Sequence, residues 1–169
     1  MFSPSLDEQV QTGEDHPRAG RDIDWGGAGL DLTEIIISKS GKWYFGTAEM
    51  FRRNILNILA AHIERNDDGS YCIKLGDDVN PITVEDVPFL ASGYVQEDDG
   101  TVKLVFHDLQ EMVLDQEQKI YFKGDVPYIS FRWPADTRLS RGVYWKLSDY
   151  FDFRGQEVYI VPASVRDIN

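Results

Sequence analysis

The sequence predicts an α+β fold made of duplicated strand–helix–strand units with mainly antiparallel sheets. Short β-branched and aromatic runs, bounded by turn residues, occur along most of the chain and are typical of strands. Two segments carry apolar residues at helical spacing. Strand-like runs flank each of these segments in the same order, which indicates an internal repeat. We therefore expect two related units that share one core.

The length and composition are those of a folded protein. The chain has 169 residues, of which 42% are apolar and 12% aromatic, enough for one domain or two small ones sharing a core. We expect a flexible N-terminal tail over residues 1–29, an N-terminal α+β unit over 30–86, and a C-terminal β-rich unit over 87–169 that ends in a helix and a strand. The tail is polar and acidic, with Trp25 near its end as an expected packing anchor in the docking segment 22–25.

The charge balance restricts the partners. The formal net charge is −12 and the sequence pI is about 4.5, so we expect neither a nucleic acid polymer nor an anionic membrane as a partner. A local basic cleft remains compatible with this charge, because screening limits charge effects to about 8–10 Å. The start of the sequence has no signal-peptide pattern, and Cys72 is the single cysteine. We expect a cytoplasmic protein without an internal disulfide.

The first unit opens with a predicted hairpin. Residues 34–38 are β-branched and predict a strand, Ser40 and Gly41 predict a turn, and residues 42–45 predict the second strand. Thr47 is the expected N-cap of a helix. Its apolar stripe runs from Phe51 to Ile63, its last turn includes Arg65, and residues 66–69 end it.

Strand patterns dominate the middle of the chain. They cover residues 71–75, 82–84, 89–95, 102–106, 111–114, 120–122 and 128–132. The Asp-Asp-Gly sequence at residues 98–100 predicts a hairpin turn between two of these strands, because an Asp-Gly pair supports the positive φ angles that tight turns need.

A second helix and a last strand close the chain. Ser140 is its expected N-cap, and Leu139 and Tyr144 are placed to pack as a hydrophobic staple. Val143, Leu147, Tyr150 and Phe151 lie on its expected apolar stripe, Gly155 breaks it, and residues 157–161 predict the final strand.

The internal repeat depends mainly on element order. When Arg53 is aligned with Arg141, apolar positions of the two helices coincide. Any two amphipathic helices would show such coincidences, so these matches are weak evidence. The arginine in each first turn and the strands before and after each helix carry more weight. Two related units would meet along an interface, and interfaces of this kind often hold ligand pockets.

The two repeated arginines are candidate anion ligands. A cation at a helix start opposes the helix dipole, so Arg53 and Arg141 in that position call for another use. Holding a phosphate is one such use. Pairing with an acid such as Glu85 or Asp86 is the alternative, and the sequence leaves both open. Arg132 and Arg138 flank Trp133-Pro134 near Tyr128, and such an arginine could stack on a nucleobase, or else lie exposed in a loop.

Several sequence blocks together resemble the domain of unknown function 1285 (DUF1285) family. They are residues 40–47 with Arg53 after them, residues 68–71, the Val-Glu-Asp-Val-Pro-Phe block at 84–89, residues 127–129 and residues 140–147. The resemblance implies a duplicated α+β core with a C-terminal half loosely like a pleckstrin-homology fold. It also implies a groove between the halves for a nucleotide-like molecule, a role in bacterial signalling and no catalysis. Arg52-Arg53 departs from the Gly-Arg pair of the family, which leaves open which arginine fills the shared position.

We therefore expect a non-catalytic protein that binds a nucleotide-like or other anionic small molecule in a cleft between the two units. It would need no cofactor and no metal. The expected ligand-binding residues are Arg53, Arg141, Arg132, Tyr128 and Trp43.

Two other functions are retained as alternatives. Exposed aromatic residues such as Trp133 and Trp145 would suit a protein-interaction module without a small ligand. A hydrolase is the weakest option, because the adjacent acids Glu85 and Asp86 would point to opposite faces of a strand and would not share a substrate.

Overall fold

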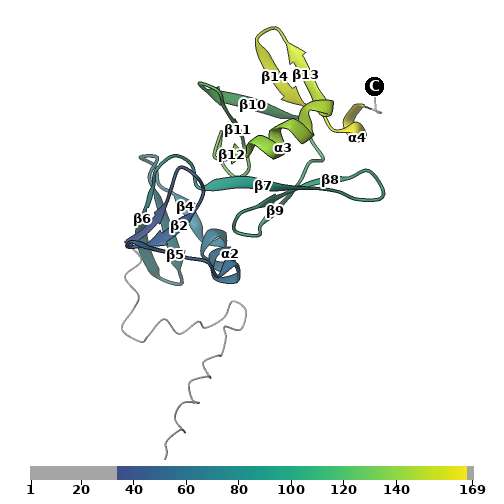
Figure 1. Cartoon of the computed structure of the whole chain (residues 1–169). Coiled ribbons are helices and arrows are strands. Elements are labelled where there is room, and N and C mark those ends of the chain that lie inside the picture. Colours follow the sequence, from purple (N-terminus) through teal and green to yellow (C-terminus); the bar gives the residue numbers. More distant parts are fainter. Residues whose placement is uncertain (1–33, 167–169) are drawn as a thin grey trace, which may run out of the picture. The chain divides into compact units, whose positions relative to one another are not determined.

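Two mixed, mainly antiparallel β-sheets dominate residues 34–166, the part of the chain that the computed structural model describes (Figure 1). The described helices are short: α2 (Arg53–Ala61), α3 (Arg141–Lys146), the 3-10 helix η2 (Leu147–Tyr150) and α4 (Ala163–Arg166). The fold is therefore mostly β, and the predicted α+β class overstates its helix content. The predicted tail 1–29, the docking segment 22–25 and Trp25 lie outside the described residues.

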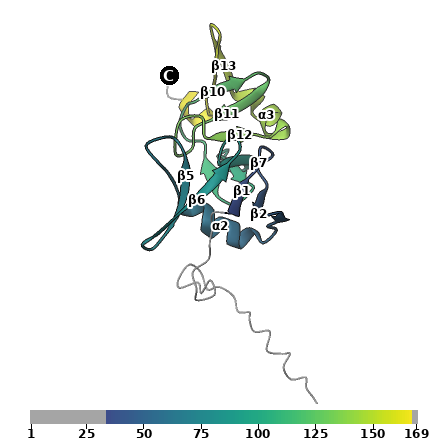
Figure 2. The same cartoon turned by 90° about the vertical axis from the view of Figure 1, so that its left-hand side faces the viewer.

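The first sheet has six strands in the order β3-β2-β1-β6-β5-β4. Their bounds are β1 (Ile35–Ile37), β2 (Trp43–Phe45), β3 (Ala48–Glu49), β4 (Ile63–Arg65), β5 (Tyr71–Leu75) and β6 (Asp78–Val84). β1 and β6 run parallel, with Ile36 opposite Thr83, and the other pairs are antiparallel. Figure 2 shows β1, β6 and β5 side by side.

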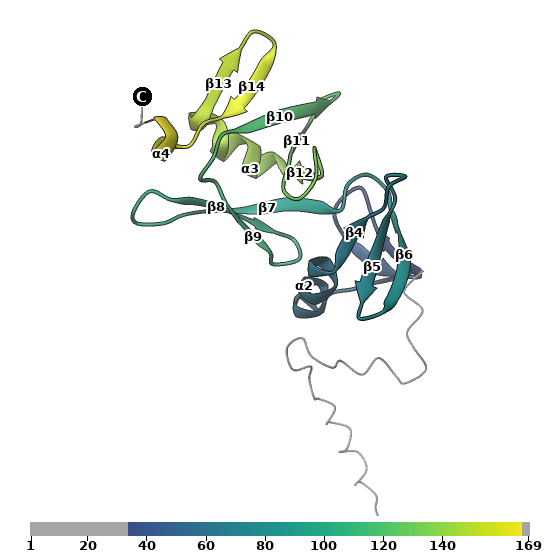
Figure 3. The same ribbon diagram turned by 180° about the vertical axis from the view of Figure 1, so that it is seen from behind.

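The second sheet has eight strands in the order β13-β14-β10-β11-β12-β7-β8-β9. Their bounds are β7 (Phe89–Gln96), β8 (Val102–Phe106), β9 (Glu111–Val113), β10 (Gln118–Lys123), β11 (Val126–Ile129), β12 (Thr137–Leu139), β13 (Phe151–Arg154) and β14 (Glu157–Ile160). Only β12 and β7 pair in parallel among these described strands. The sheet curls around α3, which lies between β10–β12 and β7 in Figures 1 and 3.

Alternating side chains build the core of each sheet. In β8, Val102, Leu104 and Phe106 are buried while Lys103 and Val105 between them are only half-buried. In the first sheet Ile35, Ile37 and Trp43 are fully buried. Period-two burial of this kind keeps one face of a strand dry and fixes its register.

The first predicted helix is shorter than the apolar stripe indicates. Thr47 does not cap it, because β3 follows Thr47 and the N-cap of α2 is Arg52. Phe51 lies before the helix and is 76% exposed. The helix ends at Ala61, and Ile63 begins β4, which pairs with β5 in antiparallel register. Pairing with β5 therefore outweighs the helical spacing of Ile63.

The second predicted helix begins correctly and ends early. The Val143 N–H donates to the Ser140 hydroxyl oxygen at 3.2 Å, so the predicted N-cap is confirmed. After η2, Phe151 starts β13 instead of continuing the helix. The predicted strand 128–132 is shifted, because β11 ends at Ile129 and residues after it form a loop.

The two halves share an element order but close differently. In each half, three antiparallel strands (β1–β3 or β10–β12) come directly before a helix whose first residue is Arg53 or Arg141, and further antiparallel strands follow it; β7–β9 of the second half have no counterpart in the first. Three strands follow α2, and the last of them, β6, returns parallel to β1. Two strands follow η2, and the last, β14, returns antiparallel to β10. The second half has one strand fewer after its helix. Its closing strand β14 therefore runs antiparallel to β10, whereas β6 runs parallel to β1.

Candidate functional site: a pocket beside α3

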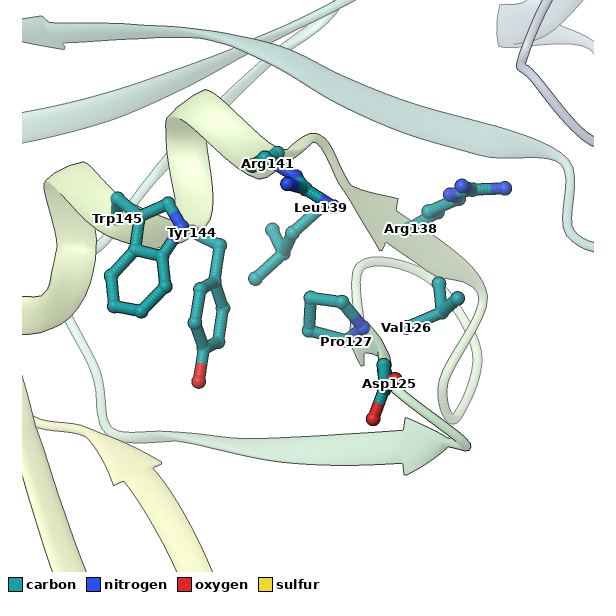
Figure 4. A pocket seen from close by; sticks show the side chains of 8 residues that line it. All are labelled: Asp125, Val126, Pro127, Arg138, Leu139, Arg141, Tyr144 and Trp145. Carbon is teal, nitrogen blue, oxygen red and sulfur yellow. The ribbon is translucent and has the colours of Figure 1, made fainter.

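A pocket of about 360 Å³ opens on the second sheet between α3 and the β10–β11 turn (Figure 4). This volume is within the usual range for small-molecule sites. Its lining residues come from the turn, β11, β12 and the first turns of α3: Asp125, Val126, Pro127, Arg138, Leu139, Arg141, Tyr144 and Trp145.

Local sequence explains how these side chains converge. Lys123 pairs with Val126, so Gly124 and Asp125 form a two-residue turn in which Gly124 has a φ of 59°, as tight hairpin turns require. Ser140 fixes the start of α3. Because side chains four positions apart share a helix face, Arg141 and Trp145 then lie on the same side of α3.

The charged groups of the pocket are two arginines and one aspartate. Arg141 is exposed and takes part in none of the ion pairs found within residues 34–166. Arg138 donates from Nη1 to the Lys39 carbonyl oxygen at 2.9 Å. Among residues 34–166, that bond is the one hydrogen bond of the Arg138 side chain, so most donors of its guanidinium have no partner in this part of the chain. The described lining of the pocket therefore carries a net positive charge, although the chain as a whole is acidic.

Aromatic rings form one wall of the pocket. Trp145 is 64% exposed, and its ring lies 5.2 Å from that of Tyr144 at an angle of 78°. The Phe122 ring meets Tyr144 edge-on at 6.3 Å. Figure 4 shows the Trp145 and Tyr144 rings on one side and Pro127 on the other, with Leu139 between them. A planar ring would find apolar surface and an aromatic face here.

An ion-paired network lies directly behind the β10–β11 hairpin. Tyr128 donates its hydroxyl hydrogen to Oδ2 of Asp86, and Lys123 Nζ lies 2.8 Å from Oδ1 of the same carboxylate. Burial opposes ionisation of Asp86, but these two hydrogen bonds outweigh it and the pKa of Asp86 is lowered. Burial, together with the Asp86 charge, raises the pKa of Tyr128 to about 12. The network anchors both strands that carry the Gly124–Asp125 turn.

Of the predicted site residues, Arg141 lines the pocket and Tyr128 supports it. Tyr128 is 3% exposed, so it contacts Asp86 rather than the pocket. Trp43 is 1% exposed and belongs to the core of the first sheet. Arg53 is exposed at the start of α2 and is not part of this lining. After burial, its charge is the largest influence that lowers the pKa of His107. The structure does not bring Arg53 and Arg141 together at this pocket.

Arg132 connects the two sheets instead of facing the pocket. Its Nη1 donates to the Ile63 carbonyl oxygen at 3.3 Å, and its Nη2 donates to Oε1 of Gln110. The guanidinium lies 5.0 Å from the centre of the Phe89 ring and 5.9 Å from that of Trp133. Burial lowers its pKa. The Arg132 guanidinium therefore lies against aromatic rings of the protein itself, and its predicted contact with a nucleobase stays a prediction.

Among the described lining residues, the predicted ligand contacts included Arg141 alone; they missed Asp125, Val126, Pro127, Arg138, Leu139, Tyr144 and Trp145. Two local signals could have revealed part of this set. The Gly124–Asp125 pair between two strand-like runs is itself a hairpin signal. Once Ser140 is taken as an N-cap, Arg141, Tyr144 and Trp145 fall on one helix face.

Two solved structures share the fold of this chain. A DUF1285 family protein from Silicibacter pomeroyi DSS-3 matches with a TM-score of 0.61 and 14% sequence identity, over 80% of this chain and 82% of that one. A DUF1285 family protein from Shewanella baltica OS155 matches with a TM-score of 0.59 and 14% identity, over 73% of this chain and 96% of that one. The predicted resemblance is thus confirmed at the level of the fold. No family model and no curated protein matches the sequence.

Within 34–166, no group of three or more His, Cys, Asp or Glu side chains is arranged to hold a metal ion. No helix in that part of the chain is long and apolar enough to cross a membrane.

Proposed function

We propose that the protein is a non-catalytic binder of a small anion with a planar ring, of the size of a mononucleotide, and that the pocket beside α3 is its site. One observation carries the proposal. Arg138 and Arg141 share a single pocket of about 360 Å³ with the rings of Tyr144 and Trp145.

The chemistry of the lining suits such a ligand. An arginine guanidinium presents paired N–H donors that match a phosphate or carboxylate. Tyrosine and tryptophan rings offer faces for stacking a heterocycle. The volume is near the lower end of the usual range for small-molecule pockets, which favours one nucleotide over a polymer. The net charge of −12 also disfavours a polymer.

Binding, and no reaction, is what the lining supports. Acid–base hydrolysis needs positioned proton donors and acceptors, whereas the lining residues that the structure describes include a single carboxylate, Asp125, and neither histidine nor cysteine. The adjacent acids Glu85 and Asp86 have separate structural contacts. Glu85 accepts from the Lys39 N–H at 3.1 Å, and Asp86 pairs with Lys123.

We take the two halves to be products of a duplication, with the curled second half loosely like a pleckstrin-homology fold. The repeated element order and the arginine that opens each helix support this. In this account the binder acts in the bacterial cytoplasm in signal transduction, a role that comes from the family resemblance.

A thermal-shift screen tests the proposed binding. Inorganic phosphate, pyrophosphate and the four common ribonucleoside monophosphates are added to the wild type and to Arg138→Ala, Arg141→Ala and Arg53→Ala. A ligand at 100 times its Kd adds about 2.7 kcal/mol of stability. We expect a nucleotide to raise the Tm of the wild type and of Arg53→Ala, the matched control outside the pocket, and to raise it less in the two pocket variants. No nucleotide-dependent shift, or equal shifts in all variants, would contradict the proposal.

A row of aromatic rings that ends at an exposed phenylalanine favours protein recognition as a second candidate. The Tyr144 and Phe151 rings lie 5.1 Å apart, the Phe151 and Phe153 rings lie 6.2 Å apart, and Phe153 is 71% exposed. Exposed aromatics are enriched at protein interfaces. This candidate predicts that the wild type captures one dominant partner from a lysate and that Phe153→Ser abolishes the capture without changing nucleotide binding. Capture of nothing by either form would remove it.

A further inference from the structure

Resting on the proposed function, we infer that the pocket selects guanine among the nucleobases through the Asp125 carboxylate. The other lining groups recognise features that nucleotides share: a phosphate for the arginines and a flat ring for the aromatic wall. Among the described lining residues, Asp125 is the one side chain that carries a negative charge, so it is the group that we take to distinguish one base from another.

The place of Asp125 suits contact with the far end of a bound nucleotide. Figure 4 shows the Asp125 carboxylate and the Arg141 guanidinium on opposite sides of Leu139 and Pro127. A nucleotide whose phosphate contacts Arg141 would then lay its base along the apolar floor and the Tyr144 ring. The edge of that base would reach the Asp125 end of the pocket.

Asp125 is held in place and left available. The Lys123–Val126 strand pair closes its turn, and the nearest lysine in sequence, Lys123, is bound by Asp86 with Nζ to Oδ1 at 2.8 Å. In the described part of the chain, Asp125 takes part in none of the ion pairs. The Asp86 contact therefore keeps the Lys123 ammonium from neutralising Asp125.

Guanine fits a carboxylate better than the other bases do. Its N1–H and exocyclic N2–H₂ are adjacent donors that point the same way, and an ionised carboxylate has two acceptor oxygens and no donor. Adenine and cytosine place a ring acceptor beside one amino donor, and uracil places carbonyl acceptors beside one N–H. Each of these would set an acceptor against the carboxylate. A good two-bond pair to a base discriminates by about tenfold or more.

Isothermal titration calorimetry with GMP, IMP and AMP tests this selectivity. IMP keeps N1–H but lacks the exocyclic amine, whereas AMP lacks both donors of the guanine pair. We expect GMP to bind about tenfold more tightly than AMP, with IMP between them. Asp125→Asn should remove most of the preference for GMP over AMP. Asp98→Asn removes an equal charge from an exposed turn outside this lining, and it should leave the preference unchanged.

The outcomes separate this inference from the proposed function. Equal binding of GMP and AMP to the wild type, or an unchanged preference in Asp125→Asn, overturns guanine selectivity and leaves the anion site standing. Absence of binding by all three nucleotides, or binding that Arg141→Ala does not weaken, overturns the proposed function and the inference with it. Circular dichroism of each variant verifies folding, and Asp125 is an exposed turn residue whose amide replacement leaves no buried group unpaired.

Discussion

Tyr128 in β11 donates a hydrogen bond to Asp86, which lies in the short segment between β6 and β7. This bond joins the segment that links the two sheets to the strand behind the pocket. Lys123 at the end of β10 binds the other oxygen of the same carboxylate. Asp86 therefore fixes both strands of the β10–β11 hairpin relative to the start of β7.

Asp86→Asn should destabilise the fold. The amide keeps one acceptor oxygen but loses the charge that Lys123 and Tyr128 share, and hydrogen bonds to charged groups contribute about 1.5–3 kcal/mol. Because the site is only partly buried, we expect the free energy of unfolding to fall by about 1–2 kcal/mol in urea titrations. Glu85→Gln is the matched control, since Glu85 is exposed and accepts a single backbone N–H. An Asp86→Asn variant as stable as this control would contradict the account.

The stabilising effect of Asp86 should disappear in acid. Its pKa is lowered in the folded protein, so the folded state favours the ionised carboxylate. The resulting stability is present above the unfolded pKa, about 3.9, and is lost as the pH falls through the folded pKa. Urea titrations from pH 7 to pH 3 should show the gap between the wild type and Asp86→Asn closing only below about pH 4. A gap that closes at higher pH, or that widens in acid, would mean that the carboxylate charge is not the cause.

Arg132→Met should weaken the joint between the sheets. Methionine replaces much of the apolar stem but removes both hydrogen bonds, to the Ile63 carbonyl oxygen and to Gln110. It also removes the cation from beside the Phe89 ring. Hydrogen bonds to charged groups contribute about 1.5–3 kcal/mol each, so the free energy of unfolding should fall by about 3 kcal/mol or more, which chemical denaturation can measure. Arg53→Met, at an exposed position, should change stability little, and an equal effect of both variants would refute the role of Arg132.

Asp136 should be among the most sensitive side chains in the loop after β11. Its buried carboxylate accepts the N–H groups of Phe131, Arg132 and Trp133 at 2.7, 2.9 and 2.9 Å. Asparagine would turn an amide donor toward these donors, and each buried unpaired donor costs about 1–3 kcal/mol. We expect Asp136→Asn to lose about 2–4 kcal/mol of unfolding free energy. Asp98→Asn is an exposed control, and comparable stability of the two variants would contradict the prediction.

Gly41 should tolerate alanine less well than Gly76 does. Both have positive φ, 84° and 60°, so both variants carry the strain of a left-handed residue, about 1–2 kcal/mol. An added Cβ at Gly41 would lie 2.6 Å from Leu90 Cδ2, whereas at Gly76 it meets nothing within 4 Å. We expect Gly41→Ala to lose about 1–3 kcal/mol more unfolding free energy than Gly76→Ala, because of overpacking. This difference measures how tightly the β1–β2 turn packs against β7. Equal losses in the two variants would contradict the prediction, because they would mean that Leu90 moves aside at no cost.

The sequence allowed the strands of the middle region to be predicted well. β5 and β8 have the predicted bounds, and the Asp-Asp-Gly turn joins β7 to β8 as expected. These segments combine alternating burial with a turn signal, so local pattern and sheet pairing agree. The N-cap role of Ser140 could be predicted equally well, because an N-cap depends on a local hydrogen bond.

The ends of both helices could not be read from spacing alone. Ile63 and Phe151 continue a helical stripe, yet each begins a strand whose partner follows a short turn. β12 was not predicted, because its three residues have little strand preference of their own and pair with β11 and with the distant β7. Such pairings depend on contacts between residues far apart in sequence, which local patterns do not record.

The candidate site was predicted only in part for a similar reason. Arg141 is recognisable from the start of its helix, but Asp125 and Arg138 join it through the register of β10, β11 and β12. Trp43 looks like an aromatic available for contact in the sequence and is core in the fold. Arg132 shows why an arginine beside aromatics is ambiguous: its ring partners belong to the protein.

The indole N–H resonance of Trp145, assigned by loss in Trp145→Phe, reports most directly on the claim that the pocket beside α3 binds a nucleotide. On titration with GMP, the account predicts a saturable shift of this resonance, an unmoved resonance for buried Trp43, and a much weaker response in Arg141→Ala. A Trp145 resonance that stays unmoved as GMP is raised into the millimolar range, or that moves equally in Arg141→Ala, would contradict it.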